Sequence, residues 1–169
     1  METGDLHFDI KDHLLLVCCQ MALESVRHRI PDGVKLTFSP AGEPIVVHAD
    51  NLRLQQLLTN LLTNAAKFTE KGEINLSFQL EPDRKKVCIA VTDTGAGIPL
   101  EKQATIFNRF EKLDDYKPGV GLGLSICLLI AERLDGALFI DSSYTDGARF
   151  VLILSCEIDS SIYNPPIEV

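Results

Sequence analysis

Three stretches of the chain place apolar residues three or four positions apart, which is the spacing of one helix face. They run over residues 14–26, 51–68 and 121–134. In the second stretch the leucines form a continuous apolar stripe, with polar residues on the opposite side. The pattern predicts three long helices, each of which buries one face.

Short polar residues and glycines mark where these helices should begin and end. We expect Asp9 to cap the first helix and Asp50 to cap the second, because a carboxylate accepts hydrogen bonds from the free amides of a first turn. Gly136 should be the C-terminal glycine of the third helix. A shorter helical piece is expected between residues 100 and 110.

Strands are predicted where apolar and polar residues alternate. They are expected at residues 34–39, 45–48, 73–81, 85–92, 137–142 and 148–156. Turn-forming residues separate the members of each successive pair, so we expect three hairpins, the first joining 34–39 to 45–48.

These elements sum to an α/β (α+β) two-layer sandwich, in which three long helices cover one face of a mixed, mainly antiparallel sheet. The chain has 169 residues and is 46% hydrophobic, which is enough for one domain with a full core. We assign residues 1–159 to that domain and residues 160–169 to a C-terminal tail or linker.

The charge and the cysteine usage narrow the class of partner and compartment. A net charge of -8 argues against nucleic acid as a partner, since such binders carry a basic face. No apolar run approaches the roughly 20 residues of a membrane span, and the first residues carry no signal-peptide pattern, so no direct membrane contact is expected. Five widely spread cysteines in apolar surroundings are typical of a reducing compartment, and we expect a cytoplasmic domain.

The turn from Asp93 to Pro99 follows an alternating strand and combines a carboxylate with two glycines. A carboxylate at the end of a strand can accept a hydrogen bond from an adenine amine. Gly95 and Gly97 let the backbone approach a flat base or a phosphate. The motif alone is weak, because Asp-Thr-Gly also surrounds the catalytic carboxylate of aspartic proteases and is compatible with an ordinary glycine-rich turn.

Asn60, Asn64 and Lys67 are spaced four and then three apart, so they project from one face of the second helix. An amide oxygen is a suitable hard ligand for Mg²⁺, and a lysine supplies a point charge for phosphate. On the helix alone, an equally good interpretation is a solvent-facing polar stripe.

Glycines also precede the third helix, in the segment from Gly119 to Leu124. Amides at a helix N-terminus attract anions, and glycines allow a triphosphate to come close. No strand precedes this segment directly, which argues against a dinucleotide-binding turn, and the chain contains no GxxxxGK[ST] loop.

Taken in this order, residues 50–126 resemble the ATP-binding catalytic domain of sensor histidine kinases, of the superfamily with the Bergerat fold that includes gyrase. Asn60 to Thr69 looks like the N box of that family, Asp93 to Pro99 like its first glycine box, Ile106 to Phe110 like its F box and Gly119 to Leu124 like its second glycine box. The flanking helices and strands extend the resemblance to about residues 8–156.

The resemblance implies ATP and Mg²⁺ as cofactors and gives each motif residue a role. Asn64 would hold Mg²⁺, Asn60 would support it, Lys67 would meet a phosphate, and Asp93 would bind the adenine amine. Residues 111–120 would form a lid, and Arg109 would either add a positive charge or form a surface ion pair. The remaining residues assigned to the nucleotide are Gly95, Gly97, Ile98, Phe110, Gly119, Gly121, Leu122, Gly123 and Leu124.

Two departures from the family refine this reading. Ala148 stands where the family often has a hydroxyl in the water network around adenine, so that contact would be weakened. Asn60 stands where gyrase-like relatives carry a glutamate, and an amide cannot act as a general base, so we expect feeble ATP hydrolysis.

The resemblance implies an ATP-dependent protein-histidine kinase module of a two-component system. None of the four histidines is followed by Glu or Asp, so the phosphoacceptor histidine would lie on a separate dimerisation domain of the parent kinase, with a response regulator downstream. The isolated domain is expected to be a monomer that binds ATP and ADP. Two alternatives stay open: a binding module in which the nucleotide only reshapes a surface, and an ATP-gated dimerising ATPase of the gyrase or MutL kind.

Overall fold

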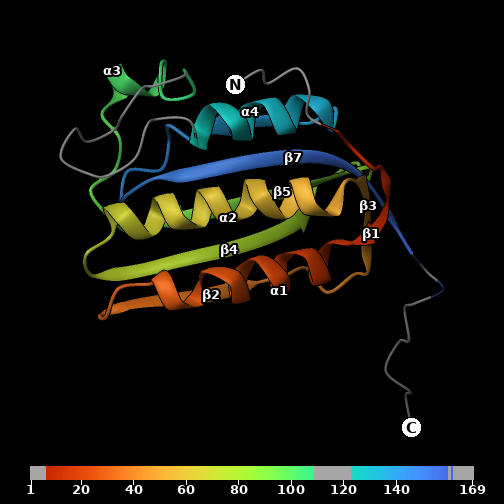
Figure 1. Ribbon diagram of the computed structural model, residues 1–169, viewed down its shortest axis with the longest axis horizontal. Coiled ribbons are helices and arrows are strands. Elements are labelled where there is room, and N and C mark those ends of the chain that lie inside the picture. The colour runs from red at the N-terminus through yellow and green to blue at the C-terminus, as the bar shows by residue number, and fades with distance from the viewer. Residues whose placement is uncertain (1–6, 109–122, 160, 162–169) are drawn as a thin grey trace, which may run out of the picture.

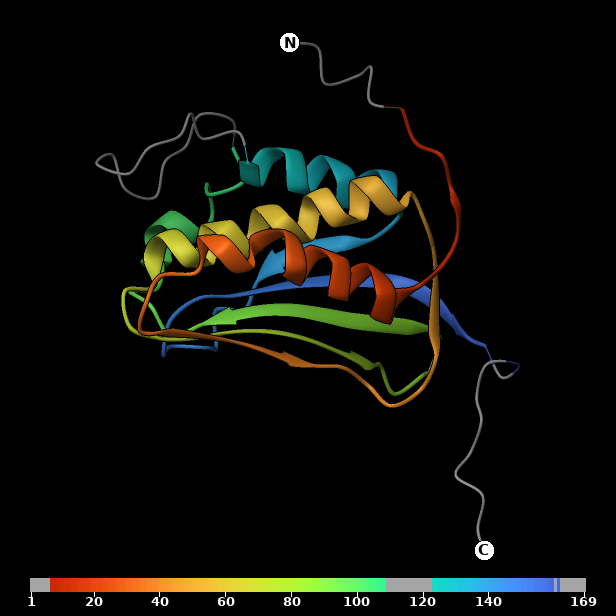
Figure 2. The same cartoon turned by 60° about the horizontal axis from the view of Figure 1, so that its bottom comes forward.

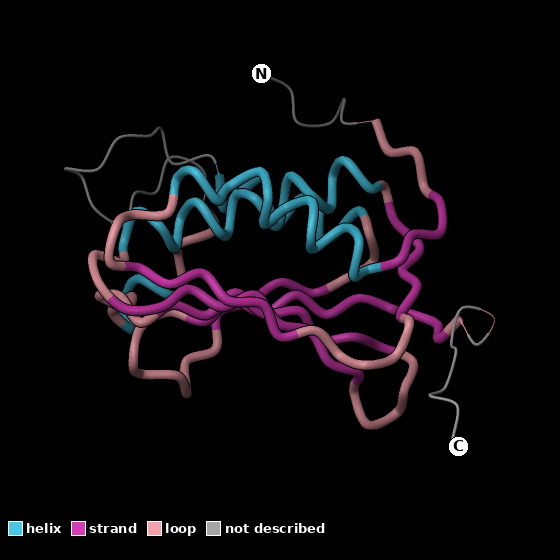
Figure 3. Tube along the Cα trace, turned by 90° about the horizontal axis from the view of Figure 1, so that it is seen from below, coloured by secondary structure: helices cyan, strands magenta, loops and turns pink. Residues whose placement is uncertain are grey.

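Helices α1, α2 and α4 form one layer of the protein and a seven-stranded sheet forms the other in the part of the chain that the structure describes (Figures 1 and 3). The structure is a computed structural model that describes residues 7–108, 123–159 and 161. The helices are α1 (Leu15–Val26), α2 (Asn51–Phe68), the short α3 (Leu100–Gln103), α4 (Gly123–Arg133) and the 3₁₀ turn η2 (Arg27–Arg29). The strands are β1 (Lys11–Leu14), β2 (Val34–Ser39), β3 (Ile45–Ala49), β4 (Gly72–Leu80), β5 (Lys86–Asp93), β6 (Ala137–Ile140) and β7 (Arg149–Ile158).

The predicted two-layer sandwich with a mixed, mainly antiparallel sheet is confirmed. The strand order is β1-β3-β7-β5-β4-β2, and β6 pairs with β7 beside β3. Among the described strands only the β2–β4 pair is parallel. On β7, β6 pairs with residues 150–153 and β3 with residues 156–158, so β6 and β3 follow one another along the same edge of that strand.

Helix α2 is the centre of the helical layer, because α1 packs on one side of it and α4 on the other (Figure 2). The stripe of leucines predicted from the sequence is buried: Leu54, Leu57, Leu58, Leu61 and Leu62 are each at most 2% exposed. Burying a leucine side chain contributes about 1.5–3 kcal/mol. This stripe therefore fixes which face of α2 remains available for polar chemistry.

The predicted hairpin between residues 34–39 and 45–48 is wrong, although both strands exist. Strand β2 pairs in parallel with β4, while β3 pairs with β1 and β7 several strands away. The connection from β2 to β4 contains α2, and a parallel pair requires such a long crossover. Alternation along a strand identifies its buried face but not its neighbour.

The start of α1 also differs from the expectation. Asp9 does not cap this helix, because β1 lies between them and the N-cap residue Leu14 makes no side-chain hydrogen bond. The backbone N–H of Asp9 instead donates to Asp50 Oδ2 at 2.7 Å. The predicted cap at Asp50 is confirmed, since its Oδ1 accepts from the N–H of Arg53 at 3.0 Å.

Gly136 follows α4 as predicted, but Asp135 is the residue with positive φ, at 56°. The N–H of Gly136 donates to Ala131 O at 2.8 Å and the N–H of Asp135 to Glu132 O at 3.1 Å, which together form a Schellman motif. A Cβ at Gly136 would lie 2.6 Å from Ile153 O. Glycine is therefore required here by the close approach to β7.

The segment 100–110 is helical over four residues only, Leu100–Gln103. Turns follow up to Asn108, and Arg109 and Phe110 lie outside the described residues. Ile106 is 1% exposed, and the ring of Phe107 meets that of Phe150 edge to face at 6.1 Å between centroids. These two side chains tie the segment to the core.

The cap at Asp50 generates a test of the fold. Asp50→Ala removes the acceptor for Arg53 N–H at the first turn of α2 and for Asp9 N–H, and the free energy of unfolding should fall by about 1–2 kcal/mol in urea titrations at pH 7. The matched control is Asp83→Ala, which loses a bond to Lys85 N–H in an exposed turn and should cost less than about 0.5 kcal/mol.

The loss of unfolding free energy in Asp50→Ala relative to the parent should depend on pH. Burial would raise the pKa of Asp50, but hydrogen bonds from the backbone of Asp9, Arg53 and Leu52 outweigh it and lower that pKa. A lowered pKa in the folded state adds stability above the ordinary value of 3.8, and this stability is lost as the pH falls through the lowered pKa. Equal unfolding curves for Asp50→Ala and the parent at pH 7 would contradict the assignment.

Candidate functional site

Asp93 is the last residue of β5 and lies on the same face as the buried residues Val87, Ile89 and Val91. It is 4% exposed. Its Oδ1 accepts hydrogen bonds from Gly95 N–H at 2.9 Å and Ala148 N–H at 3.2 Å. No donor among the described residues is bonded to Oδ2, so this oxygen is available to a ligand.

Burial raises the pKa of Asp93, and the two amide hydrogen bonds, from Gly95 and Ala148, act in the opposite direction. The fold therefore keeps a carboxylate in a place that penalises its charge. Polar groups under such strain are common at functional sites.

The loop after Asp93 packs directly on the C-terminal end of α2. Ala96 N–H donates to Phe68 O at 3.3 Å, and a Cβ at Gly95 would overlap the same carbonyl. Gly97 has a φ of 75°, and a Cβ there would lie 3.1 Å from Gly147 O. Both glycines of the predicted motif are thus required by backbone packing, and their contact with a nucleotide stays a prediction.

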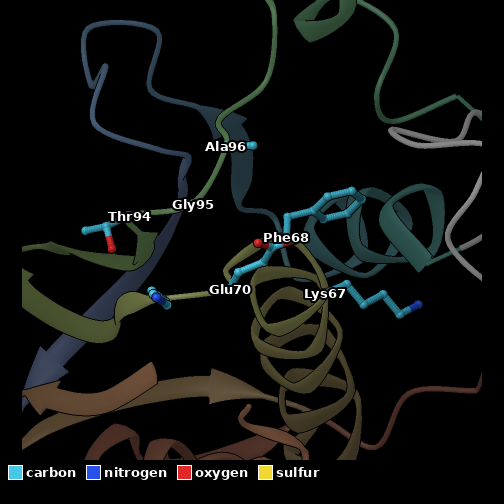
Figure 4. A pocket seen from close by; sticks show the side chains of 7 residues that line it. Lys67, Phe68, Glu70, Thr94, Gly95 and Ala96 are labelled. Carbon is cyan, nitrogen blue, oxygen red and sulfur yellow. The ribbon is translucent and has the colours of Figure 1, made fainter. Parts of the chain in front are cut away.

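A hollow of about 410 Å³ opens where this loop meets the end of α2 (Figure 4). In the close-up, Lys67, Phe68 and Ala96 project to one side of the helix end and Thr94 to the other. The hollow is lined by Lys67, Phe68, Glu70, Lys71, Thr94, Gly95 and Ala96. It therefore combines two ammonium groups, an aromatic ring and the glycine loop.

The three polar residues predicted on one helix face, Asn60, Asn64 and Lys67, all lie on α2, four and then three positions apart. Asn60 and Asn64 are half-buried and Lys67 is exposed. The thiol of Cys127 on α4 donates to Leu57 O at 3.7 Å, and Asn60 is close enough to act on the pKa of this thiol, so Asn60 lies on the α4 side of the helix. Burial raises the pKa of Cys127 to about 12, which makes this thiol an unreactive core group, as its apolar surroundings predict.

Three observations test whether the residues present fit a nucleotide with Mg²⁺. Asp93 Oδ2 has no bonded donor, as described above. Thr69 is 1% exposed, and its Oγ1 has no hydrogen-bond partner among the described residues. That hydroxyl lies beside Gly95, since a Cβ there would come within 2.9 Å of it. Both residues lie next to Gly95, which lines the hollow, and such unpaired polar groups fit a site that a polar ligand completes.

The donor set also fits Mg²⁺ in character. The described residues contain no group of three or more His, Cys, Asp or Glu side chains placed to hold a metal. Mg²⁺ usually keeps several waters and takes only one or two protein ligands together with substrate phosphates. Coordination by the amide of Asn64 together with a triphosphate would match this preference of Mg²⁺, whereas coordination by protein groups alone would not.

The second half of the predicted site is described only in part. Gly123 is the exposed first residue of α4 and Leu124 follows it, half-buried. Ile98, predicted to contact the nucleotide, is half-buried in the loop. The predicted residues that lie outside the described part of the chain are Arg109, Phe110, Gly119, Gly121, Leu122 and the lid at 111–120.

The sequence predicted the turn between β6 and β7, but it did not predict the side-chain contacts that join this turn to the loop after Asp93. The hydroxyl of Tyr144 donates to Asp93 O at 2.9 Å. Gln103 Nε2 donates to Ile98 O at 2.9 Å, and Ser142 Oγ donates to Gln103 Oε1 at 2.7 Å. No periodicity or local motif signals these contacts, because the partners are about 40–50 residues apart in the chain.

None of the described helices is long and apolar enough to cross a membrane.

Comparison with known proteins agrees with this geometry. Residues 49–158 match the family model described as histidine kinase-, DNA gyrase B-, and HSP90-like ATPase. The autoinducer 2 sensor kinase/phosphatase LuxQ of Vibrio vulnificus is 36% identical over 135 residues, which cover 72% of this chain and 16% of LuxQ. Other related kinases are also much longer than this chain, which spans from 7% to 40% of their length.

Solved structures resemble the fold over most of the chain. The mycobacterial sensor histidine kinase MprB matches with a TM-score of 0.78 at 25% identity, covering 89% of this chain and 100% of that one. Full-length ShkA in complex with AMPPNP also matches with a TM-score of 0.78 at 25% identity, covering 91% of this chain and 32% of that one. With its matched family model over residues 49–158, the chain therefore belongs to the family of histidine kinase-, DNA gyrase B-, and HSP90-like ATPases, and its relatives in that family are sensor histidine kinases.

Proposed function

We propose that the chain binds ATP with Mg²⁺ and transfers the terminal phosphoryl group to a histidine on a separate dimerisation domain of its parent kinase, which then passes it to a response regulator. The observation that carries the proposal is the Asp93 carboxylate, which is buried, held through Oδ1 and unbonded at Oδ2 among the described residues, and which directly precedes the loop residues Thr94, Gly95 and Ala96 that line the hollow at the end of α2. The kinases among its relatives support the class of reaction. Because the proposed reaction consumes ATP, which is found in the cytoplasm, the proposal includes a cytoplasmic location for this domain.

At the base end, Asp93 would accept the exocyclic amine of adenine. A charge-assisted hydrogen bond in a buried site is stronger than a neutral one, and it selects for a donor at that position. Gly95 and Gly97 would make room for the base, and the neighbouring Ile98 would offer an apolar contact to it.

At the phosphate end, the polar face of α2 would hold the triphosphate and its metal. Asn64 would be a ligand of Mg²⁺, Asn60 would support it, and Lys67 would pair with a phosphate. Gly123 and Leu124 open α4, whose first amides would face the same phosphates. Mg²⁺ would supply neutralisation of the charge that develops on the transferred group.

The polar face of α2 favours transfer over hydrolysis. This helix contains no Asp or Glu, and its candidate position for a general base is Asn60. An amide cannot remove a proton from water, so a positioned nucleophile from a partner would be the acceptor. His13 and His48 lie on β1 and β3, at the other end of α2 from the hollow (Figure 1). None of the four histidines of the chain is followed by Glu or Asp, so an acceptor on another domain is part of the proposal.

A first test concerns the adenine end. Asp93→Asn keeps an oxygen for Gly95 and Ala148 N–H, but its amide NH2 group would then face the adenine amine, donor against donor. The affinity for ADP in calorimetric titration should therefore fall by about tenfold or more. Because the pKa of Asp93 is raised in the folded state, its ionisation costs stability at neutral pH, and the variant without nucleotide should melt no lower than the parent.

The control for that test is Asp12→Asn, which removes a carboxylate charge beside His48 at the far end of the protein and should bind ADP like the parent. Unchanged ADP affinity in Asp93→Asn would remove Asp93 from the site.

A second test concerns the metal. With Asn64→Ala, Mg²⁺ should no longer strengthen the binding of a non-hydrolysable ATP analogue, whereas ADP binding without metal should stay within about twofold of the parent. The matched control is Asn75→Ala, which removes an amide on the face of the sheet away from the helices and should keep the metal effect. A full metal effect in Asn64→Ala would show that another group binds Mg²⁺.

A third test concerns the reaction. The chain is mixed with the histidine-containing helical domain of its parent kinase and ATP labelled on the terminal phosphate, and acid-labile label should appear on that domain only when both proteins are present. A histidine-to-alanine version of the acceptor domain is the control. Release of labelled phosphate by the chain alone, faster than transfer, would instead favour an ATPase.

A further inference from the structure

The turn between β6 and β7 holds Asp93 from behind. Asp93 N–H donates to Ala148 O at 2.9 Å, and Asp93 O accepts from the hydroxyl of Tyr144 at 2.9 Å. The amide of Ala148 also bonds the carboxylate. The backbone of Gly147 lies so close that a Cβ there would overlap Asp93 O. Every polar main-chain atom of Asp93 is therefore engaged by a segment that lies about 50 residues away in the chain.

The Tyr144 hydroxyl is well placed to act as a donor. It is half-buried, and burial together with the nearby charges of Asp146 and Asp93 raises the pKa of Tyr144. The phenol therefore keeps its proton at neutral pH and donates it to the carbonyl. A phenylalanine at this position would leave that carbonyl without its donor.

The turn itself is braced, so it can serve as a fixed support. Asp141 accepts from Ser143 N–H at 3.0 Å and from Ser143 Oγ at 2.6 Å. Arg149 contacts Asp141 through Nε at 3.4 Å and donates to Thr92 Oγ1 at 3.2 Å. These contacts join the turn to the last residues of β5.

A second contact holds the other end of the same loop. Gln103 donates to Ile98 O through Nε2 and accepts from Ser142 Oγ through Oε1. The β6–β7 turn therefore fixes the segment 93–98 at both of its ends, through Tyr144 and through Ser142 and Gln103. A loop fixed in this way presents Asp93 Oδ2 in one direction.

We propose that Tyr144 is a positioning residue that aims the Asp93 carboxylate and so determines selectivity for adenine over 6-oxopurine nucleotides. The inference rests on the proposed function, in which Asp93 accepts the adenine amine. A 6-oxopurine carries a carbonyl oxygen instead of the amine, so its 6-position cannot donate to the carboxylate and brings a partial negative charge toward it. Selectivity between the two bases therefore depends on the direction and fixity of that carboxylate.

The experiment measures the dissociation constants of ADP and inosine diphosphate for the parent and for Tyr144→Phe by calorimetric titration. The parent should prefer ADP. In Tyr144→Phe the affinity for ADP should fall about three- to tenfold, as expected for the loss of one positioning hydrogen bond. The affinity for inosine diphosphate should stay within about twofold, so the ratio between the two nucleotides should fall. A change that merely loosened the fold would weaken both nucleotides equally.

Ser161→Ala is the matched control, because it removes the same kind of serine-to-aspartate side-chain hydrogen bond just after β7, away from Asp93 and its supporting turn. It should leave both affinities and their ratio unchanged. An unchanged ratio in Tyr144→Phe, or an equal loss for both nucleotides, would overturn the inference while leaving the proposed function intact. A parent that binds neither nucleotide would refute the proposed function, and a parent that binds both equally would refute the role of Asp93 itself.

Discussion

The candidate site depends on a carboxylate that the fold keeps buried. Asp93 is 4% exposed, and burial raises its pKa, so its charge is unfavourable where it lies. Backbone amides of Gly95 and Ala148 offset that cost through Oδ1, since amide donors stabilise an ionised acceptor. The offset is partial, and the second oxygen stays unbonded among the described residues. A ligand with a donor at that point would complete the group.

The sheet order makes this arrangement possible. Because β5 pairs with β7, the end of β5 meets the turn that leads into β7, and Ala148 can bond both the main chain and the side chain of Asp93. The same end of the sheet lies beside the C-terminal end of α2, where Phe68 O accepts from Ala96 N–H. Three chain segments thus converge without room for a Cβ at Gly95 or Gly147. The close approach of these segments therefore requires glycine at both positions.

Local patterns predicted most elements and the two hairpins β4–β5 and β6–β7, but they missed β1 and the pairings between distant segments. The leucine stripe of α2 and its cap at Asp50 were predictable because both depend on residues within a few positions. The pairing of β2 with β4 and the contact of Tyr144 with Asp93 were not, because each joins segments far apart in the chain. The motif residues Asn60, Asn64 and Asp93 could be identified from type and spacing, yet their burial and hydrogen bonds needed the fold.

Helix α2 serves two purposes, and these restrict its sequence. Its leucines must face the sheet and its two neighbouring helices, which leaves polar residues on the α1 side, such as Gln55 and Thr59, and a polar strip with Asn60 on the α4 side. That strip carries amides and a lysine but no carboxylate. Amides can hold a metal and phosphates without drawing a proton from water. Under the proposed function, the chemistry of these residues would separate binding of a triphosphate from its hydrolysis, and the acceptor would be a nucleophile brought by another domain.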